Sequence, residues 1–459
     1  MPTVETIYVG TIVHSLSQTQ LAYLNPGILG VHTDGTIAFL HTLPPSTPLN
    51  TFLTTLTPNT PTIRHLPPHT LLLPGFIDTH IHAPQYPFSG TGYTLPLLTW
   101  LTTYTFPHER RFASLSYAES IYKRVVAKSL RCGTTTAAWY GTIHTPATIL
   151  LARTCMEMGQ RAFVGKVCMD RNGGQDYEES SVEQSIEDTK AFIRGVQSLD
   201  SKLVQPILTP RFAVSCTSEL LNDISKLADS ENLRIQTHCA ENKNECTLVE
   251  SLFNLPYVQA YASCGILGPK TILAHCIHLS DSDRELLSRT QTSISHCPVS
   301  NFALSSGICN VRALLDCGIN VGLGTDVAGG WSTNLLTAIR NALIASRVLS
   351  MADGTLPLTL EESFYMATLG GATTLGLESV TGNFITGKSF DAILVDLDAC
   401  ADSRRDEFAS RTVDVFEGED VKHFFEKFVF LGDERNVVEV FVVGGVLRFL
   451  PIALEFLDL

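Results

Sequence analysis

Short apolar runs rich in β-branched residues alternate with longer amphipathic runs over most of the chain. The short runs have the length and composition of buried strands, whereas the longer ones repeat apolar residues at helical spacing. Two helices are predicted over 116–133, closing on Gly133, and over 218–232, opening on Ser218 as its N-cap. Strands that alternate with helices predict a parallel sheet. The eight predicted strands begin at Leu71, Gly133, Arg161, Leu203, Leu233, Lys270, Thr292 and Ile319.

The number of predicted strands favours one architecture. Eight strand–helix units within residues 74–382 fit an α/β fold of the (β/α)8 TIM-type barrel class. Further helices over 332–350 and 358–376 would complete the barrel. An open doubly wound sheet is the competing topology, but the GxGxxG turn typical of that fold does not follow the first predicted strand.

Both ends of the chain have the alternation of antiparallel strands. Residues 1–40 and the last seventy or so residues hold too few strands for either end to be stable alone. We therefore expect 1–73 and 383–459 to join in one small β-sandwich domain beside the barrel of 74–382. Residues 44–68 contain seven prolines, which predicts a loop or extended connection.

Composition excludes several classes of protein. Hydrophobic residues make up 44% and charged residues 17% of the 459, as in a chain that folds throughout. The net charge of -14, with no basic stripe, excludes nucleic acid as a partner. The N-terminus lacks the pattern of a signal peptide, and no uninterrupted apolar stretch suits a membrane span, so we expect a soluble cytoplasmic protein without a membrane partner. The twelve cysteines are interpreted as free thiols.

Polar side chains recur where the predicted strands end. Five of the 14 histidines and one aspartate stand there, although histidines elsewhere, such as His14, His65, His108 and His423, fall in loops, helices or the terminal sheets. In a (β/α)8 barrel the carboxyl ends of the strands carry the active site, so these residues should meet at one mouth. The strand-end residues are His80, His82, Arg211, His238, His275, His296 and Asp326.

Cysteine follows histidine three times, at Cys239, Cys276 and Cys297, which could suggest a mixed Cys/His metal site. Side chains alternate along a strand, so a histidine that faces the mouth turns the next cysteine toward the helices. We therefore expect these thiols to pack as small hydrophobic groups.

Imidazole nitrogens combined with a carboxylate oxygen suit Zn2+, with iron as the alternative. His80 and His82 lie two residues apart, so both rings project from one face of a strand toward one ion. A bound zinc ion lowers the pKa of water to about 7, which favours hydrolysis. Glu241 follows His238 by three residues and is the candidate proton shuttle, the alternative being a solvated loop residue. The PCxxC element of another class of zinc deaminases is absent.

Several motifs carry a resemblance to a known family. PGFIDTHIHAPQY, HCAEN, TILAHC and GTDVAGG resemble the amidohydrolase superfamily of metal-dependent barrel hydrolases. More narrowly, THIHAPQYPFSGTGYTLPLLTWLTTYTFPHERRF, RAFVGKVCMD, TPRFAVSC, SHCPVSN and GLGTDVAGG are similar to the guanine deaminase family within it. The resemblance implies hydrolysis of guanine to xanthine and ammonia, and a homodimer.

The resemblance also implies roles for individual residues. One zinc ion per chain would be held by His80, His82, His238 and Asp326. His275 would hold the attacking water, Glu241 would shuttle protons, and Asp326 would double as general base. Gln85, Arg211 and Phe212 would bind the purine, with His82, His238, Glu241 and Asp326 also facing it.

Two other functions are weighed against this one. The same barrel and metal could serve another purine, a pyrimidine or a triazine, and a substrate without a ring carbonyl would leave Arg211 unpaired. A catalytically dead barrel used as a scaffold is the non-enzymatic alternative. Every residue that the resemblance assigns as a ligand is present, which argues against the scaffold.

Overall fold

The computed structural model describes residues 2–44, 47–57, 60–174, 176–399 and 412–447. The chain divides into two compact units. Unit 1 comprises Met1–His14, Ala22–Gly75 and Phe384–Leu459, and unit 2 comprises Ser15–Leu21 and Phe76–Asn383. Unit 1 is therefore built from both ends of the chain.

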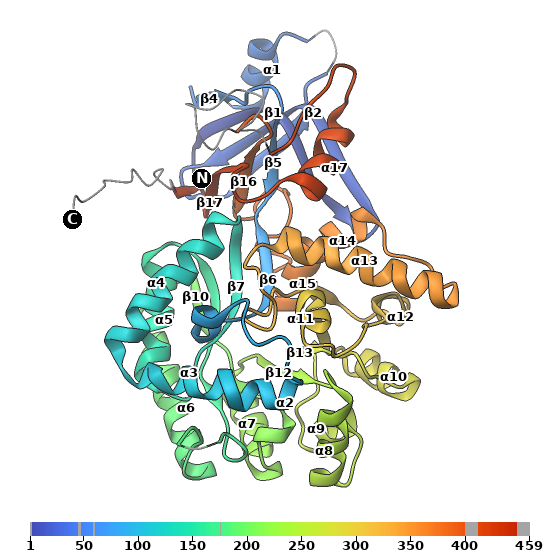
Figure 1. Cartoon of the computed structure of the whole chain (residues 1–459). Coiled ribbons are helices and arrows are strands. Elements are labelled where there is room, and N and C mark those ends of the chain that lie inside the picture. The colour runs from blue at the N-terminus through green and yellow to red at the C-terminus, as the bar shows by residue number, and fades with distance from the viewer. Residues whose placement is uncertain (1, 45–46, 58–59, 175, 400–411, 448–459) are drawn as a thin grey trace, which may run out of the picture. The chain divides into compact units, whose positions relative to one another are not determined.

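Unit 1 contains one eight-stranded sheet in which strands from the two ends pair directly. The pairing is antiparallel between β16 and β5, where Leu394 lies opposite Leu72. In Figure 1 the blue N-terminal strands and the red C-terminal strands accordingly occupy the same sheet. The order is β18-β17-β16-β5-β1-β2-β3, with β4 beside β1. The elements are β1 (Val4–Ser17), β2 (Gln20–His32), β3 (Ile37–Thr42), α1 (Leu49–Leu56), β4 (Thr62–His65), β5 (Thr70–Pro74), β16 (Ala392–Asp396), α17 (Val421–Leu431), β17 (Val437–Val442) and β18 (Gly445–Leu447).

The sheet of unit 1 curls over its own core. Tyr8 on β1 and Phe441 on β17 are three strand spacings apart, which is about 14 Å in a flat sheet. Their ring centroids are nevertheless only 5.7 Å apart, and Phe390 packs against both rings. One buried apolar cluster therefore joins side chains from the N-terminal and C-terminal strands.

The prediction of a loop or extended connection over 44–68 was wrong for 49–56, which are helical. The segment contains α1 and β4. Its seven prolines precede α1 at 44, 45 and 48 or follow it at 58, 61, 67 and 68, so none interrupts the helix. Leu53 of α1 is buried against Ile7 and Ile28, and this burial outweighs the weak helix propensity of the threonines.

Unit 2 has parallel strands with helices between them, so the predicted α/β class with a parallel sheet is confirmed. The sheet orders are β10-β8-β7-β6 and β12-β13-β14-β15, with a β11-β9 pair. The predicted runs from Arg161 and Leu203 each form two short strands instead of one. The strands are β6 (Phe76–His82), β7 (Thr134–Tyr140), β8 (Arg161–Gly165), β9 (Val167–Cys168), β10 (Val204–Pro206), β11 (Thr209–Pro210), β12 (Ile235–Cys239), β13 (Thr271–His275), β14 (Ser293–His296) and β15 (Val321–Leu323).

Backbone hydrogen bonds link the two four-stranded sheets at both of their edges. Near β12, the Gln236 N–H donates to the carbonyl of Leu208 at 2.9 Å. At the other edge, the Asp326 N–H donates to the carbonyl of His80 at 2.9 Å, and the His82 N–H donates to that of Val327 at 3.1 Å. The segment that follows the last strand, β15, is therefore bonded to the first strand, β6.

Helices follow the strands of unit 2 in sequence, and Figure 1 shows α4, α5, α6 and α7 outside the strands. The helix predicted to open on Ser218 is present, but its N-cap is Thr217, whose hydroxyl accepts the Leu220 N–H. The run 358–376 forms two helices that break at Thr368. The helices are α2 (Leu97–Trp100), α3 (Phe106–Arg110), α4 (Leu115–Arg131), α5 (Thr145–Glu157), α6 (Val182–Gln197), α7 (Ser218–Glu231), α8 (Lys243–Phe253), α9 (Tyr257–Ser263), α10 (Asp281–Thr290), α11 (Pro298–Ala303), α12 (Val311–Asp316), α13 (Leu335–Asp353), α14 (Leu360–Ala367) and α15 (Leu369–Leu375).

Among the described residues, one helix, α13, is long and apolar enough to cross a membrane by length and composition. It packs against α11 and α14, and side chains such as Leu336, Ile339 and Leu343 are buried there. These contacts are those of a core helix in a folded domain.

The described cysteines are free thiols, as predicted, and Cys400 lies outside the described residues. Cys239, Cys276 and Cys297 are buried. None of the three belongs to the group of converging metal-binding side chains among the described residues.

A buried ion pair supports the strands that lead to the site. The Lys166 ammonium donates to the Glu179 carboxylate, and both side chains are almost fully buried. Glu179 also accepts the Met169 N–H at 3.0 Å, just after β9. Because β9 pairs with β11, this ion pair holds the strand that ends beside Arg211.

Replacing Lys166 by methionine should therefore destabilise the protein by about 3–5 kcal/mol, because Glu179 would remain buried without a counter-charge. Chemical denaturation monitored by circular dichroism measures the effect. The double variant Lys166→Met/Glu179→Leu should lose less stability than Lys166→Met, because it leaves no buried charge unpaired. Lys123, in an exposed pair with Glu119, is the matched control, and Lys123→Met should leave the unfolding midpoint nearly unchanged. Equal losses of stability in Lys166→Met and Lys123→Met would contradict the structural role of the Lys166–Glu179 ion pair.

Candidate metal centre and substrate pocket

Four nitrogen and oxygen atoms converge at the carboxyl ends of the unit 2 strands. The Nε2 atom of His82 lies 3.2 Å from that of His80 and 3.1 Å from that of His238. One carboxylate oxygen of Asp326 lies 3.1 Å from His80 Nε2 and 3.3 Å from His82 Nε2. Donors about 2.0–2.1 Å from a tetrahedral zinc ion would be about 3.3–3.4 Å apart, so these distances suit one such ion.

The strands bring these side chains together by the alternation that the sequence predicts. His80 and His82 project from β6 toward one point, where their Nε2 atoms are 3.2 Å apart. Asp78 accepts the N–H and hydroxyl of Thr325 at 3.1 and 2.5 Å and so holds the turn that presents Asp326. Burial raises the pKa of Asp78 to about 7.

Hydrogen bonds outside the cluster fix the orientation of two imidazoles. His238 donates its Nδ1–H to the carbonyl of Arg211 at 2.6 Å, which leaves its Nε2 lone pair facing His82. His275 donates its Nδ1–H to the side-chain oxygen of Asn301 at 3.0 Å. A partner of this kind sets the tautomer and direction of a metal-ligating histidine.

The imidazoles are in the protonation state that a metal requires. Burial lowers the pKa of His80 and His238, and it lowers that of His82 to about 4. They are therefore neutral at pH 7, the form in which histidine binds metals. Burial alone would raise the pKa of Asp326, but its interactions with His80 and His82, hydrogen bonds included, hold that pKa well below its usual value. The residues thus fit a divalent cation.

His275 competes with His82 as a possible fourth ligand. Single donor atoms of His80, His238, His275 and Asp326 all lie within 4.8 Å of one another. His275 Nε2 is 3.8 Å from an Asp326 oxygen, however, which is longer than the distances that join His82 to its neighbours. The spacing therefore favours His82 in the ion's inner set and leaves His275 at its edge.

Glu241 lies beside this cluster, in the left-handed turn at Ala240 between β12 and α8. One carboxylate oxygen is 3.5 Å from His275 Nε2, and the other accepts the Ser306 hydroxyl at 3.1 Å. Burial and the nearby Asp326 charge raise the pKa of Glu241 to about 8. A buried carboxyl with such a pKa can both give and accept a proton near neutral pH.

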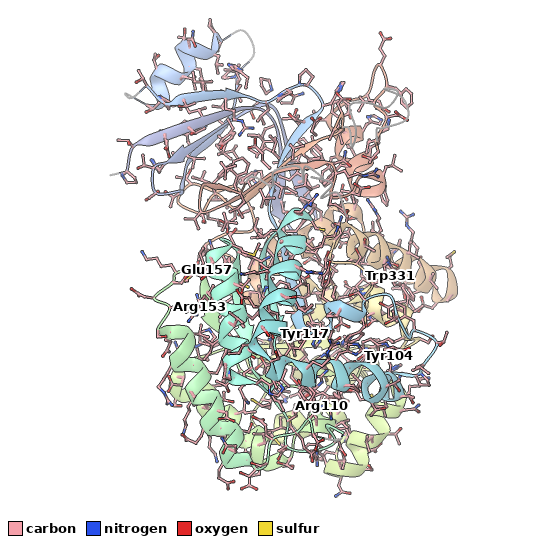
Figure 2. The ribbon with its side chains drawn as sticks, turned by 60° about the vertical axis from the view of Figure 1, so that its left-hand side comes forward. Tyr104, Arg110, Tyr117, Arg153, Glu157 and Trp331 are labelled. Atoms are coloured by element: carbon pink, nitrogen blue, oxygen red, sulfur yellow. The ribbon has the colours of Figure 1, made fainter. Side chains whose placement is uncertain are left out.

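His82, His238 and Asp326 of this cluster line a hollow. Part of its apolar wall comes from one continuous helical segment, which consists of α2, the π-helical turn Leu101–Thr105 and α3. The start of this segment lines the hollow through Leu97, Trp100 and Leu101. Figure 1 shows the segment in front of the strands. Tyr104 and Arg110 mark this segment in Figure 2. This wall was not predicted from the sequence. The hollow is lined by His82, Gln85, Leu97, Trp100, Leu101, Arg211, Phe212, His238, Glu241, His275, Leu304, Asp326 and Gly329.

The three residues that the resemblance assigns to substrate binding, Gln85, Arg211 and Phe212, all line the hollow. Arg211 follows β11, and its guanidinium lies 5.1 Å from the ring of Phe106. Phe212 forms a backbone bridge with His238. Arg211 does not stand alone, because both of its terminal nitrogens donate to Glu109, at 2.6 and 3.1 Å.

Two strand-end residues differ from the expectation of one common mouth. His296 ends β14 and is buried, but it does not line the hollow. Burial lowers its pKa to about 3. Asp326 lies three residues beyond β15 and is brought back by the bond of its N–H to His80. The turn at Asp326, as well as the ends of the strands, therefore brings the metal-binding side chains together.

Comparisons with known proteins agree with this geometry. The sequence model of the amidohydrolase family matches residues 71–447. The chain is 46% identical to the guanine deaminase of Dictyostelium discoideum over 82% of each chain, and 42% identical to that of Mus musculus over 96% of each. It superposes on the crystal structure of guanine deaminase from C. acetobutylicum with bound guanine at a TM-score of 0.85 and 33% identity, covering 97% of this chain and all of the other.

Proposed function

The chain belongs to the amidohydrolase family, and we propose that it hydrolyses guanine to xanthine and ammonia. One observation carries the proposal: three of the four converging residues, His82, His238 and Asp326, line a single hollow with Gln85, Arg211 and Phe212. A planar ring would fit against the aromatic and apolar wall of this hollow. The converging metal-binding side chains would then lie on one side of the ring, and Arg211 would offer a hydrogen-bond donor to a ring carbonyl on another side.

We assign one zinc ion per chain to His80, His82, His238 and Asp326. The short donor distances and the neutral imidazoles support this set. When bound, zinc supplies Lewis acidity that gives water a pKa of about 7. The nitrogen-rich donor set favours zinc over the harder cations calcium and magnesium.

The proton steps are assigned to residues around the attacking water. His275 and Asp326 hold it by hydrogen bonds, and Asp326 accepts its proton as the oxygen attacks C2 of the ring. Glu241 protonates the ring nitrogen, takes up the proton that Asp326 received from the water and passes it to the departing amine, which leaves as neutral ammonia. The remaining hydroxyl proton of the tetrahedral intermediate then returns to Glu241 as the new carbonyl forms. The 3.5 Å separation of Glu241 from His275 brings the acid and the water-holding residue to one place.

Recognition is assigned to the opposite side of the hollow. Arg211 donates to the ring carbonyl, Gln85 contributes amide hydrogen bonds, and Phe212 stacks on the ring. Because Arg211 has only donors, an amino group in place of the carbonyl would meet no acceptor. The pocket should therefore distinguish guanine from adenine.

Ammonia release should be rapid with guanine and about 10^4-fold slower or absent with adenine, because a buried donor left without an acceptor strongly disfavours the wrong substrate. The assay should include pyrimidines and triazines, with metal content measured on the same sample. Comparable turnover of adenine would reject the selectivity for guanine, and turnover of a triazine alone would favour the related-substrate alternative. Full metal content without turnover of any compound would favour the scaffold.

We also infer a closed (β/α)8 barrel and a β-sandwich for the two units. The hydrogen bonds that link β6 to the segment after β15 support closure. The 5.7 Å contact between Tyr8 and Phe441 supports two layers made by one curled sheet. The homodimer, the cytoplasmic location and the absence of a membrane or nucleic-acid partner stay predictions.

A further inference from the structure

Glu109 lies behind the hollow and receives four hydrogen bonds. It is on α3, fully buried, and does not line the hollow. One carboxylate oxygen accepts Arg211 Nη1 at 2.6 Å and the Tyr177 hydroxyl at 2.7 Å. The other accepts Arg211 Nη2 at 3.1 Å and Gln85 Nε2 at 3.0 Å. A single carboxylate therefore joins both polar residues assigned to substrate recognition.

These bonds fix the direction of each recognition side chain. The two parallel bonds hold the Arg211 guanidinium in one plane, as a bidentate pair does. The amide of Gln85 is held at both ends, because its oxygen accepts the Ala328 N–H at 3.2 Å while its nitrogen donates to Glu109. A flipped amide would turn an oxygen toward the carboxylate, so only one orientation is favourable.

Glu109 also cancels the charge of the pocket wall. Arg211 is the only lysine or arginine among the described residues that line the hollow. Its pairing with Glu109 gives a wall with hydrogen-bond donors but without net positive charge. Such a wall suits a neutral carbonyl compound, whereas an unpaired guanidinium would attract anions.

Charge is important because substrate and product differ in acidity. Exchange of the guanine amino group for a second carbonyl leaves a ring N–H between two carbonyls. Xanthine therefore loses a proton more readily than guanine. A net-positive wall would retain the xanthine anion, and a neutral wall would release it.

We propose that Glu109 is a positioning residue that aligns Arg211 and Gln85 and, by cancelling the Arg211 charge, makes the pocket bind neutral purine lactams in preference to their anions. This inference rests on the proposed function for the identity of the ligand. It assigns no contact between Glu109 and the substrate.

The test compares Glu109→Gln with the unmodified, metal-loaded enzyme. KM and kcat for guanine are measured together with the dissociation constants of hypoxanthine and xanthine by calorimetry near pH 8. Hypoxanthine has one ring carbonyl and stays neutral, whereas much of the xanthine is anionic. The KM for guanine should rise about 10-fold to 100-fold through lost alignment, with a smaller change in kcat. An unpaired Arg211 would bind the xanthine anion more tightly. The dissociation constant of hypoxanthine divided by that of xanthine should therefore rise about tenfold or more.

Two further variants separate alignment from charge. Glu109→Asp keeps the charge but shortens the side chain, so KM should rise while the ratio of the two constants stays as in the unmodified enzyme. Tyr177→Phe removes one donor to Glu109 and leaves the Arg211 bonds, so KM should change less than about threefold. If Glu109→Gln does not fold, the aspartate variant still tests the proposal, because an unchanged KM or a shifted ratio would overturn it.

The outcomes distinguish this inference from the proposed function. Absence of guanine turnover by the unmodified enzyme would reject the proposed function, while the two dissociation constants would still test the effect of Glu109. Normal turnover with an unchanged KM in Glu109→Gln would reject the positioning role. A raised KM with an unchanged ratio of constants would reject the role in charge selection.

Discussion

His82→Ala should abolish guanine deamination and tight metal binding together. The His82 Nε2 atom is within 3.3 Å of donor atoms from His80, His238 and Asp326, so its loss removes the atom closest to all the others. Metal content by inductively coupled plasma spectrometry should fall from about one ion per chain to near zero after dialysis. Ammonia release should fall below detection in the same sample.

Two histidine variants make this test specific. His275→Ala should lose activity but keep the ion, because His275 is assigned to the water and not to the metal. His65 is exposed on β4, and His65→Ala should change neither metal content nor activity. Full metal content in His82→Ala together with loss of metal in His275→Ala would mean that His275 takes the fourth ligand position.

Glu241→Gln should lower kcat by about 10^2-fold to 10^4-fold and leave metal content unchanged. Glutamine keeps the shape and can still bond to Ser306, but it cannot transfer the proton that the ring nitrogen and the departing amine require. The position of the carboxyl, 3.5 Å from His275, and its pKa of about 8 suit repeated proton transfer. Steady-state kinetics under saturating guanine measure the effect.

Glu245 offers a matched control for this substitution. It is another buried carboxyl, four residues further along, which accepts the backbone N–H groups of Glu241 and Asn242 at 2.9 and 3.1 Å and does not line the hollow. Glu245→Gln should reduce kcat less than about tenfold and mainly lower stability. Near-normal turnover by Glu241→Gln would falsify the shuttle assignment and make His275 the next candidate.

The strands and most of the candidate site could be predicted from the sequence because both depend on local patterns. The two-residue spacing of His80 and His82 determines their common face on β6, whatever the rest of the fold. The polar residues after apolar runs mark the ends of parallel strands, so Arg211, His238 and His275 could be predicted at one mouth. The motifs around them identified the family.

Non-local features could not be predicted in the same way. Glu109 binds partners 24, 68 and 102 positions away, and no periodicity relates those positions. It lies within the HERRF motif, but the motif alone does not reveal which of its charged residues is buried. The helix α1 does not follow from the composition of 44–68, because the prolines that dominate this segment flank the helix and none lies within it. At the start of α7, Thr217 and Ser218 are both good caps, and only the backbone geometry selects Thr217.

The bond between His238 and the backbone of Arg211 has a consequence for how such an enzyme can diversify. The imidazole is oriented by a main-chain carbonyl, which every amino acid possesses, while the side chain of the same residue lines the hollow. A codon change at this position can therefore alter which compounds are accepted without altering the tautomer of the metal ligand. Substitutions at position 211 can therefore change substrate preference while the residues that carry out hydrolysis stay the same.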